Sequence, residues 1–291
     1  MTTTDPHATR EDILKGYTKI ARDGQWSGVQ ASSKTNGSCC GGGGCCGPTT
    51  LTAEQVGLAV GYGAEDLAAL PEGANMGLSC GNPTAIAALK PGEVVLDLGS
   101  GGGMDCFLAG PRVGPIGRVI GVDMTPDMLT KARRNIESYR RQSKLDNVEF
   151  RLGEIEHLPV ADASIDVVLS NCVINLSPDK AQVWHEIARV LKPGGRVAIS
   201  DLALVKPLPE AVVADLEALV GCVAGAELID TIHADMQTAG LTDIELNSKP
   251  GYVDAMTTWQ DPLYQKIIAA LPEGSKVSDF VTSLDIAARK S

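Results

Sequence analysis

The feature that most constrains this chain is the run VVLDLGSGGGM at residues 94–104. Apolar, β-branched residues lead directly into glycines, which is typical of a buried parallel strand that ends in a tight turn and opens a helix. Glycine suits such a turn because it has no Cβ to hinder a positive φ or the close approach of a ligand. We therefore expect a ligand-binding turn at Gly99 and Gly101.

The order of glycines and acids in this run predicts the class of ligand. A dinucleotide-binding turn reads G-x-G-x-x-G and holds a pyrophosphate at the helix N-terminus, whereas here Met104 takes the place of the last glycine. Asp97 lies two residues before the first glycine, where a carboxylate repels phosphate and suits an ammonium group. The run therefore predicts S-adenosylmethionine rather than NAD. A turn that binds nothing is the alternative, so a second strand has to support the prediction.

A second apolar run, residues 117–123, ends in Asp123. It lies about 20 residues after the glycine turn, where nucleoside-binding folds place a carboxylate that accepts hydrogen bonds from ribose hydroxyls. Thr125 and Pro126 then suit the N-cap and the first position of a helix. Together the two runs predict one βαβ nucleoside-binding site.

Composition limits the classes of function that remain. The 291 residues are enough for one large domain, or for one domain with an appendage. We expect a cytoplasmic protein without a membrane segment, because no apolar run approaches the roughly 18 residues that a span needs and residues 1–10 lack the apolar region of a signal peptide. The net charge of −11 argues against binding to a nucleic acid backbone. Eight cysteines without an export signal indicate a reducing compartment.

Strand and helix patterns alternate along most of the chain, which predicts an α/β fold with a doubly wound parallel sheet. The predicted helices of this part lie at 11–21, 65–70, 84–89, 127–143 and 180–191, and its strands at 94–98, 117–123, 148–152, 165–170 and 195–201. The pattern then loosens into helices at 210–220 and 228–239 and strands near 244–246 and 281–287. We predict an N-terminal helix and a flexible Cys/Gly-rich arm (1–60), an S-adenosylmethionine-binding domain (61–205) and a C-terminal α+β cap on the substrate side (206–291).

The arm contains Cys39, Cys40, Cys45 and Cys46, two pairs that flank four glycines. The segment has too few apolar side chains to fold alone, so it would present thiolates on a flexible tether. Zinc is one candidate ion, although zinc sites usually need four ligands in fixed geometry. A disordered segment that binds nothing is the alternative.

Three further cysteines fall in loops near the predicted ligand end of the sheet. Cys172 directly follows the strand at 165–170, Cys222 lies on the segment after the strand that ends at Asp201, and Cys80 lies in a turn-rich loop at 71–83. Ligands of open α/β sheets bind beyond the carboxyl ends of the strands, so the topology predicts that these thiols converge. A buried structural cysteine is the alternative for each of them, and we adopt it for Cys106.

The segments 71–83, 97–103, 170–175 and 221–226 resemble those of the arsenite methyltransferases, and the likeness runs from about residue 62 to 226. The resemblance implies a Rossmann-like, class I methyltransferase that moves methyl groups from S-adenosylmethionine to trivalent arsenic in arsenic detoxification. It implies that Cys80, Cys172 and Cys222 bind the arsenic. The positions that it implies for lining the cofactor are Asp97, Gly99, Gly101, Asp123, Met124, Ile155, Glu156 and Asn171.

The chain departs from the family at two places. The family usually has one further N-terminal cysteine where this chain has two pairs, so all four arm cysteines are candidate accessory arsenic ligands. Ile232 and His233 stand where we expect an aromatic residue, which leaves the number of methyl groups added open. The expected partners are trivalent arsenic as a thiol conjugate and a thioredoxin or glutathione-type reductant.

Two other functions stay open on the sequence. One is a methyltransferase for a small organic substrate, such as a sterol or quinone precursor, in which the cysteines are incidental. The other is a metalloid-sequestering protein that uses its cysteine arm without catalysis. Arsenic binding without methyl transfer would indicate the second, and activity that thiol blocking leaves unchanged would indicate the first.

Overall fold

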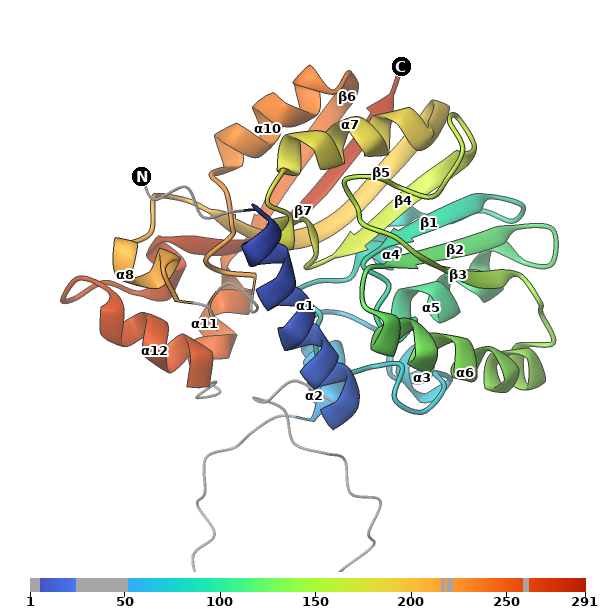
Figure 1. Cartoon of the computed structure of the whole chain (residues 1–291), viewed down its shortest axis with the longest axis horizontal. Helices are drawn as coiled ribbons and strands as arrows, with labels where there is room; N and C mark the ends of the chain where they lie inside the picture. The colour runs from blue at the N-terminus through green and yellow to red at the C-terminus, as the bar shows by residue number, and fades with distance from the viewer. Residues whose placement is uncertain (1–5, 25–51, 216–217, 219–221, 259–261) are drawn as a thin grey trace, which may run out of the picture.

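The computed structural model describes residues 6–24, 52–215, 218, 222–258 and 262–291 (Figure 1). The predicted arm, with Cys39, Cys40, Cys45 and Cys46, lies outside the described residues. At the centre is a seven-stranded sheet with the order β3-β2-β1-β4-β5-β7-β6. Its strands are β1 (Val94–Leu98), β2 (Arg118–Asp123), β3 (Val148–Leu152), β4 (Ile165–Asn171), β5 (Leu191–Leu204), β6 (Leu241–Lys249) and β7 (Val281–Lys290).

Strands β1 to β5 are parallel, as the alternating pattern predicts, but β7 is antiparallel to both β5 and β6. The strands predicted near 244–246 and 281–287 thus extend the parallel sheet at this edge, and β7 adds its antiparallel strand. The chain between β6 and β7 forms α11 (Pro250–Thr258) and α12 (Pro262–Ala270) at the carboxyl ends of the parallel strands. Because β7 starts from that end and inserts between β5 and β6, it must run in the opposite direction.

Helices cover both faces of the sheet. Helices α4 (Pro83–Ala87), α5 (Met104–Val113) and α6 (Pro126–Ser143) share one apolar cluster with Val95 of β1. On the other face of the sheet, Leu96 and Leu98 of β1 belong to a second apolar cluster, which includes residues of α7 (Lys180–Val190) and α10 (Ile229–Thr238). Side chains of a strand alternate between the two faces, so β1 contributes to both cores.

The remaining elements gather near the carboxyl ends of β1 to β5 (Figure 1). They are α1 (Pro6–Asp23), α2 (Ala53–Ala59), α3 (Ala64–Ala68), α8 (Glu210–Val213), two 3-10 turns at Ile174–Leu176 and Val277–Asp279, and α11 and α12. An apolar cluster joins Ile13 of α1, Leu204 of β5 and Val253 of α11. Strands β6 and β7 continue the main sheet, whereas α8, α11 and α12 pack at its ligand end. The division at residue 205 stays a prediction.

Several predicted elements differ from the observed ones in length. The helix expected at 11–21 runs from Pro6 to Asp23, and the strand expected at 195–201 runs from Leu191 to Leu204. Of the helix expected at 210–220, residues 210–213 form α8. Helices α2, α11 and α12 were not predicted. Among the described residues, no helix has the length and apolar character needed to cross a membrane.

Candidate active site

The glycine turn after β1 has the predicted backbone geometry. Gly99 and Gly101 have φ values of 64° and 50°, in the left-handed region that glycine adopts without steric cost. A Cβ on Gly99 would lie 2.4 Å from Cγ2 of Val173. The turn therefore has no room for a side chain at Gly99, and α5 begins at Met104, directly after the turn.

Asp123, the last residue of β2, holds this turn. Its Oδ2 accepts the N–H of Gly101 at 2.9 Å, and its Oδ1 accepts the N–H of Thr125 at 2.7 Å. Burial raises the pKa of Asp123, and these two hydrogen bonds oppose that rise. Each carboxylate oxygen has a second lone pair, so Asp123 retains acceptor capacity for hydroxyl groups of a ligand.

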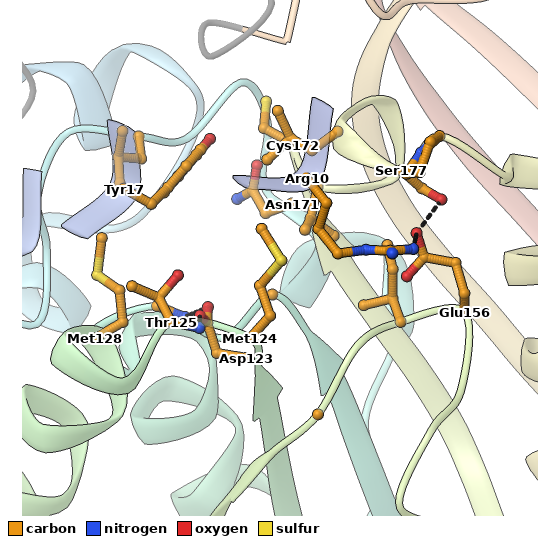
Figure 2. A pocket seen from close by; sticks show the side chains of 18 residues that line it. Arg10, Tyr17, Asp123, Met124, Thr125, Met128, Glu156, Asn171, Cys172 and Ser177 are labelled. Carbon is orange, nitrogen blue, oxygen red and sulfur yellow. Dashed lines mark hydrogen bonds and ion pairs between the residues drawn. The ribbon is translucent and has the colours of Figure 1, made fainter. Parts of the chain in front are cut away.

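A pocket opens beside the turn and contains about 720 Å³ of empty space, part of it open to solvent. We call it the donor pocket (Figure 2). Its lining is Arg10, Tyr17, Leu78, Gly99, Gly101, Asp123, Met124, Thr125, Met128, Gly153, Ile155, Glu156, Asn171, Cys172, Val173, Leu176, Ser177 and Pro178.

Helix α1 forms one wall of the donor pocket. In Figure 2, Tyr17 lies across the pocket from Asp123, and the Arg10 side chain extends toward Glu156. Nη2 of Arg10 is 3.3 Å from Oε1 of Glu156, and the same oxygen accepts the hydroxyl of Ser177 at 2.6 Å. An ion pair and a shared carboxylate thus join α1 to the far side of the pocket.

The three loop cysteines meet at the edge of this pocket. Cys80 and Cys172 form a disulfide, with Cα atoms 6.1 Å apart despite a sequence separation of 92 residues. Sγ of Cys222 donates to the backbone carbonyl of Cys172 at 2.9 Å and lies 3.9 Å from the hydroxyl of Tyr17. Burial raises the pKa of the Cys222 thiol, and the nearby Asp201 raises it further.

The backbone around two of these cysteines is unusual. Cys172 has a φ of 53° and Cys222 a φ of 64°, in a region that residues other than glycine rarely adopt. Such conformations cost about 1–3 kcal/mol and cluster at functional sites. Cys172 adopts this conformation directly after the last residue of β4, and Cys222 adopts it on the segment that follows β5.

A carboxyl group lies next to the disulfide. The sulfurs of Cys80 and Cys172 and a carboxylate oxygen of Asp201 are within 4.8 Å of one another. Asp201 accepts from the Asn175 amide at 2.9 Å and from the N–H of Ile174 at 3.0 Å. Burial nevertheless raises its pKa to about 7. The site thus combines soft sulfur ligands, one buried acid and an adjoining pocket beside the glycine turn.

The chain resembles known methyltransferases in sequence and in fold. Residues 89–265 match the family model of a methyltransferase domain. The solved structure of an arsenic (III) S-adenosylmethionine methyltransferase from Chlamydomonas reinhardtii is 33% identical, with a TM-score of 0.58, over 81% of this chain and 72% of that one. The chain belongs to the arsenite methyltransferase family.

Curated relatives carry the same family name. An arsenite methyltransferase of Halobacterium salinarum is 48% identical over 88% of this chain and 63% of its own length. The human arsenite methyltransferase is 46% identical over 40% of this chain and 32% of its own length. The chain thus spans less than two thirds of the length of these family members. A phosphoethanolamine N-methyltransferase of Haemonchus contortus, at 20% identity and a TM-score of 0.57, shares the fold.

Most of the residues that the family resemblance implies for the cofactor line the donor pocket. They are Gly99, Gly101, Asp123, Met124, Ile155, Glu156 and Asn171. Asp97 is not among the lining residues: its carboxylate is buried, and Oδ2 accepts the Cys106 thiol at 3.2 Å. Burial and the neighbouring Asp105 raise the pKa of Asp97. The structure therefore places Asp97 behind the turn, against α5.

Sequence reasoning missed the contribution of α1 to the site. The amphipathic pattern of residues 11–21 predicts a helix but gives no information on where that helix packs. Ile20 of α1 packs in the apolar cluster that contains Met128, and Ile13 of α1 packs in the cluster that contains Cys80 and Cys222. This packing brings Arg10 and Tyr17 into the pocket lining. The arm cysteines lie outside the described residues, so their relation to the site stays a prediction.

Proposed function

We propose that this chain transfers methyl groups from S-adenosylmethionine to trivalent arsenic bound by Cys80, Cys172 and Cys222, as a step of arsenic detoxification. The observation that carries the proposal is the meeting of the three cysteines at the edge of a pocket with a glycine turn and a buried acid. The relatives and the solved structure named above support the same chemistry.

The donor pocket fits S-adenosylmethionine. Asp123 would accept hydrogen bonds from the ribose hydroxyls, Met124 and Ile155 would line the bound cofactor, and the glycine turn would allow its close approach. When bound, S-adenosylmethionine supplies an electrophilic methyl group. Asp97, whose carboxylate accepts the Cys106 thiol of α5, would act indirectly rather than by contact with the ligand.

The three cysteines provide the ligands that trivalent arsenic prefers, because thiolates bind soft, polarisable centres. Arsenic bound to three thiolates keeps a lone pair that can attack the methyl group, so no general base is required. The chain's part is to hold the arsenic near the donor pocket and to exclude water, and a near-attack separation of about 3–3.5 Å lowers the barrier by several kcal/mol. The arm cysteines would act as accessory ligands that capture the arsenic first.

The methyl group arrives without its bonding electrons, so the new arsenic–carbon bond formally raises arsenic from the trivalent to the pentavalent state. Two electrons must return. The thiolates of Cys80 and Cys172 can supply them by forming the disulfide that the structure contains. A thioredoxin or glutathione-type thiol, supplied by a reducing compartment such as the cytoplasm, would then reopen it.

Serine substitutions test this assignment. We expect Cys172→Ser and Cys222→Ser to lose methylation of arsenite and of trivalent methylarsenic, with S-adenosylmethionine binding retained, because a hydroxyl is a hard and largely protonated ligand. Cys80→Ser should fail on arsenite yet keep some activity on methylarsenic with strong thiol reductant, since methylarsenic needs one thiolate fewer. Products are identified by chromatography with elemental detection. Full arsenite turnover by Cys80→Ser, or normal activity of Cys172→Ser or Cys222→Ser, would contradict this division of roles among the three cysteines.

A further inference from the structure

The Cys80–Cys172 disulfide lies between two pockets that share no lining residue. Cys172 lines the donor pocket, whereas Cys80 lines a second pocket of about 510 Å³ of empty space, part of it open to solvent. We call this second one the thiol pocket. Its lining is Ala59, Val60, Cys80, Gly81, Lys249, Gly251, Tyr252, Ala255 and Ser283.

We propose that the thiol pocket binds a small anionic thiol, which reduces the disulfide by attacking Sγ of Cys80 and releasing Cys172. This inference rests on the proposed function, since it assigns the site where the oxidised enzyme is regenerated. It also selects between the two kinds of reductant that the proposed function leaves open.

Each pocket is lined by a different cysteine of the disulfide. A thiolate attacks one sulfur of a disulfide and releases the other. An attacker in the thiol pocket would reach Cys80, and the departing sulfur would be that of Cys172, which lines the donor pocket. Cys80 is held for this attack because its N–H donates to Asn171 Oδ1 at 3.2 Å and its carbonyl accepts Ser283 Oγ at 2.8 Å.

Burial of the target favours a small thiol over a protein reductant. Only 2% of Cys80 is exposed, so a reductant has to enter the thiol pocket to reach its sulfur. Four of the residues that line this pocket, Ala59, Gly81, Gly251 and Ala255, have a single methyl group or no side chain. Such a lining leaves room for a slim thiol-bearing chain.

The charge of the thiol pocket favours an anionic thiol. Lys249 is the lining residue that carries a full charge, and half of its side chain is exposed. Its ammonium pairs with Asp285, but an ammonium has three donors, so it can also contact a carboxylate of the ligand. Tyr252, which donates to the carbonyl of Ser79 at 3.3 Å, closes another side of the pocket.

The exchange balances with two equivalents of thiol. The first thiolate forms a mixed disulfide with Cys80, and the S–S bond breaks with its electron pair on Cys172. A second thiolate attacks the sulfur of the bound reductant, which leaves as a small-molecule disulfide and frees Cys80. The two external thiols are oxidised, the protein disulfide is reduced, and the protons of the external thiols pass to the two cysteines.

The test measures how fast the oxidised full-length protein is reduced, without arsenic or S-adenosylmethionine. The probes are glutathione, which is anionic, and 2-mercaptoethanol, which is neutral. We expect Lys249→Gln to slow reduction by glutathione about threefold, as expected for an exposed charge pair, and to leave reduction by 2-mercaptoethanol within about twofold. Lys192→Gln is the matched control, because Lys192 also pairs with an aspartate, Asp166, with 39% of its side chain exposed. Ala255→Phe should slow both thiols.

Mapping the adduct supplies an independent readout. Brief exposure to glutathione followed by alkylation should place glutathione on Cys80 and the alkyl group on Cys172, also in a chain whose four arm cysteines are serine. Four results would overturn the proposal. The first two are glutathione attached to Cys172 and reduction that requires the arm cysteines. The others are a Lys192→Gln variant that slows reduction by glutathione as much as Lys249→Gln does, and an oxidised protein in which Cys80 and Cys172 are not linked. Arsenite methylation by the same preparations is measured separately, so failure of the proposed function is distinguishable from failure of the thiol pocket.

Discussion

Oδ1 of Asn171 accepts the backbone N–H of Cys80 at 3.2 Å, although 91 residues separate them in the sequence. The amide nitrogen of Asn171 donates to the hydroxyl of Tyr62 at 2.9 Å, and that hydroxyl donates to Asp105 at 2.7 Å. Asn171 also lines the donor pocket. One chain of hydrogen bonds therefore links Cys80 to the donor pocket.

Tyr62→Phe tests this positioning. Loss of the hydroxyl leaves the buried Asp105 with one hydrogen bond fewer, so we expect a loss of about 1–3 kcal/mol in the free energy of unfolding. We also expect a higher KM for arsenite with an unchanged Kd for S-adenosylmethionine. Tyr139→Phe is the control, because its buried hydroxyl bonds Asn147 away from the site. An equal KM change in both variants would show that Tyr62 acts through stability alone.

Tyr17→Phe should shift the pH dependence of arsenic capture. Burial raises the pKa of Cys222, and the contact with Tyr17 opposes that rise. Capture needs the thiolate, so its rate increases with pH. Without the hydroxyl, the pKa of Cys222 rises further and the increase moves to higher pH. Stopped-flow measurement of arsenite capture across the thiol titration range checks this, and an unshifted profile contradicts it.

Arg10→Gln should weaken S-adenosylmethionine binding about threefold at low salt, because the ion pair with Glu156 joins α1 to the opposite wall of the pocket. The difference from the wild-type chain should shrink at high salt, which screens the pair. Lys15→Gln removes an exposed ion pair of the same helix, with Glu11, and should have no effect. Calorimetry at two salt concentrations distinguishes the two; identical affinities of both variants would refute a role for Arg10.

Gly99→Ala should abolish S-adenosylmethionine binding, whereas Gly240→Ala should not change it. Both glycines have a positive φ, 64° and 85°, so alanine is strained at either position by about 1–2 kcal/mol. Only at Gly99 would the new Cβ also collide with Val173, which lines the pocket; a Cβ at Gly240 meets nothing within 4 Å. Melting temperatures and calorimetric Kd values separate strain from the loss of the site.

Asp105 should make the protein less stable as the pH rises from about 4 to 6. Burial raises its pKa from 3.8 to about 6, so in this range the folded protein holds a proton that the unfolded chain has released. The free energy of unfolding therefore falls by about 3 kcal/mol across the window through this group. Urea unfolding as a function of pH should show a shallower slope for Asp105→Asn, and equal slopes would contradict the assignment.

The sequence by itself determined the local elements of this protein. The glycine turn, the acid at the end of β2 and the position of Cys172 directly after β4 are encoded by short-range patterns: apolar periodicity, turn chemistry and the need for a positive φ. The parallel sheet from β1 to β5 follows from the alternation of strands and helices. These features depend on neighbours within a few residues, so a single sequence is sufficient to predict them.

Only the tertiary structure decided how distant segments meet. The packing of α1 against the pocket, the insertion of β7 between β5 and β6, the placement of Asp97 behind the turn and the disulfide between Cys80 and Cys172 join segments that lie far apart in the chain. Apolar burial drives this packing, and burial is not directional. Periodicity therefore identifies which face of an element is buried, while the surface that covers it depends on the whole fold.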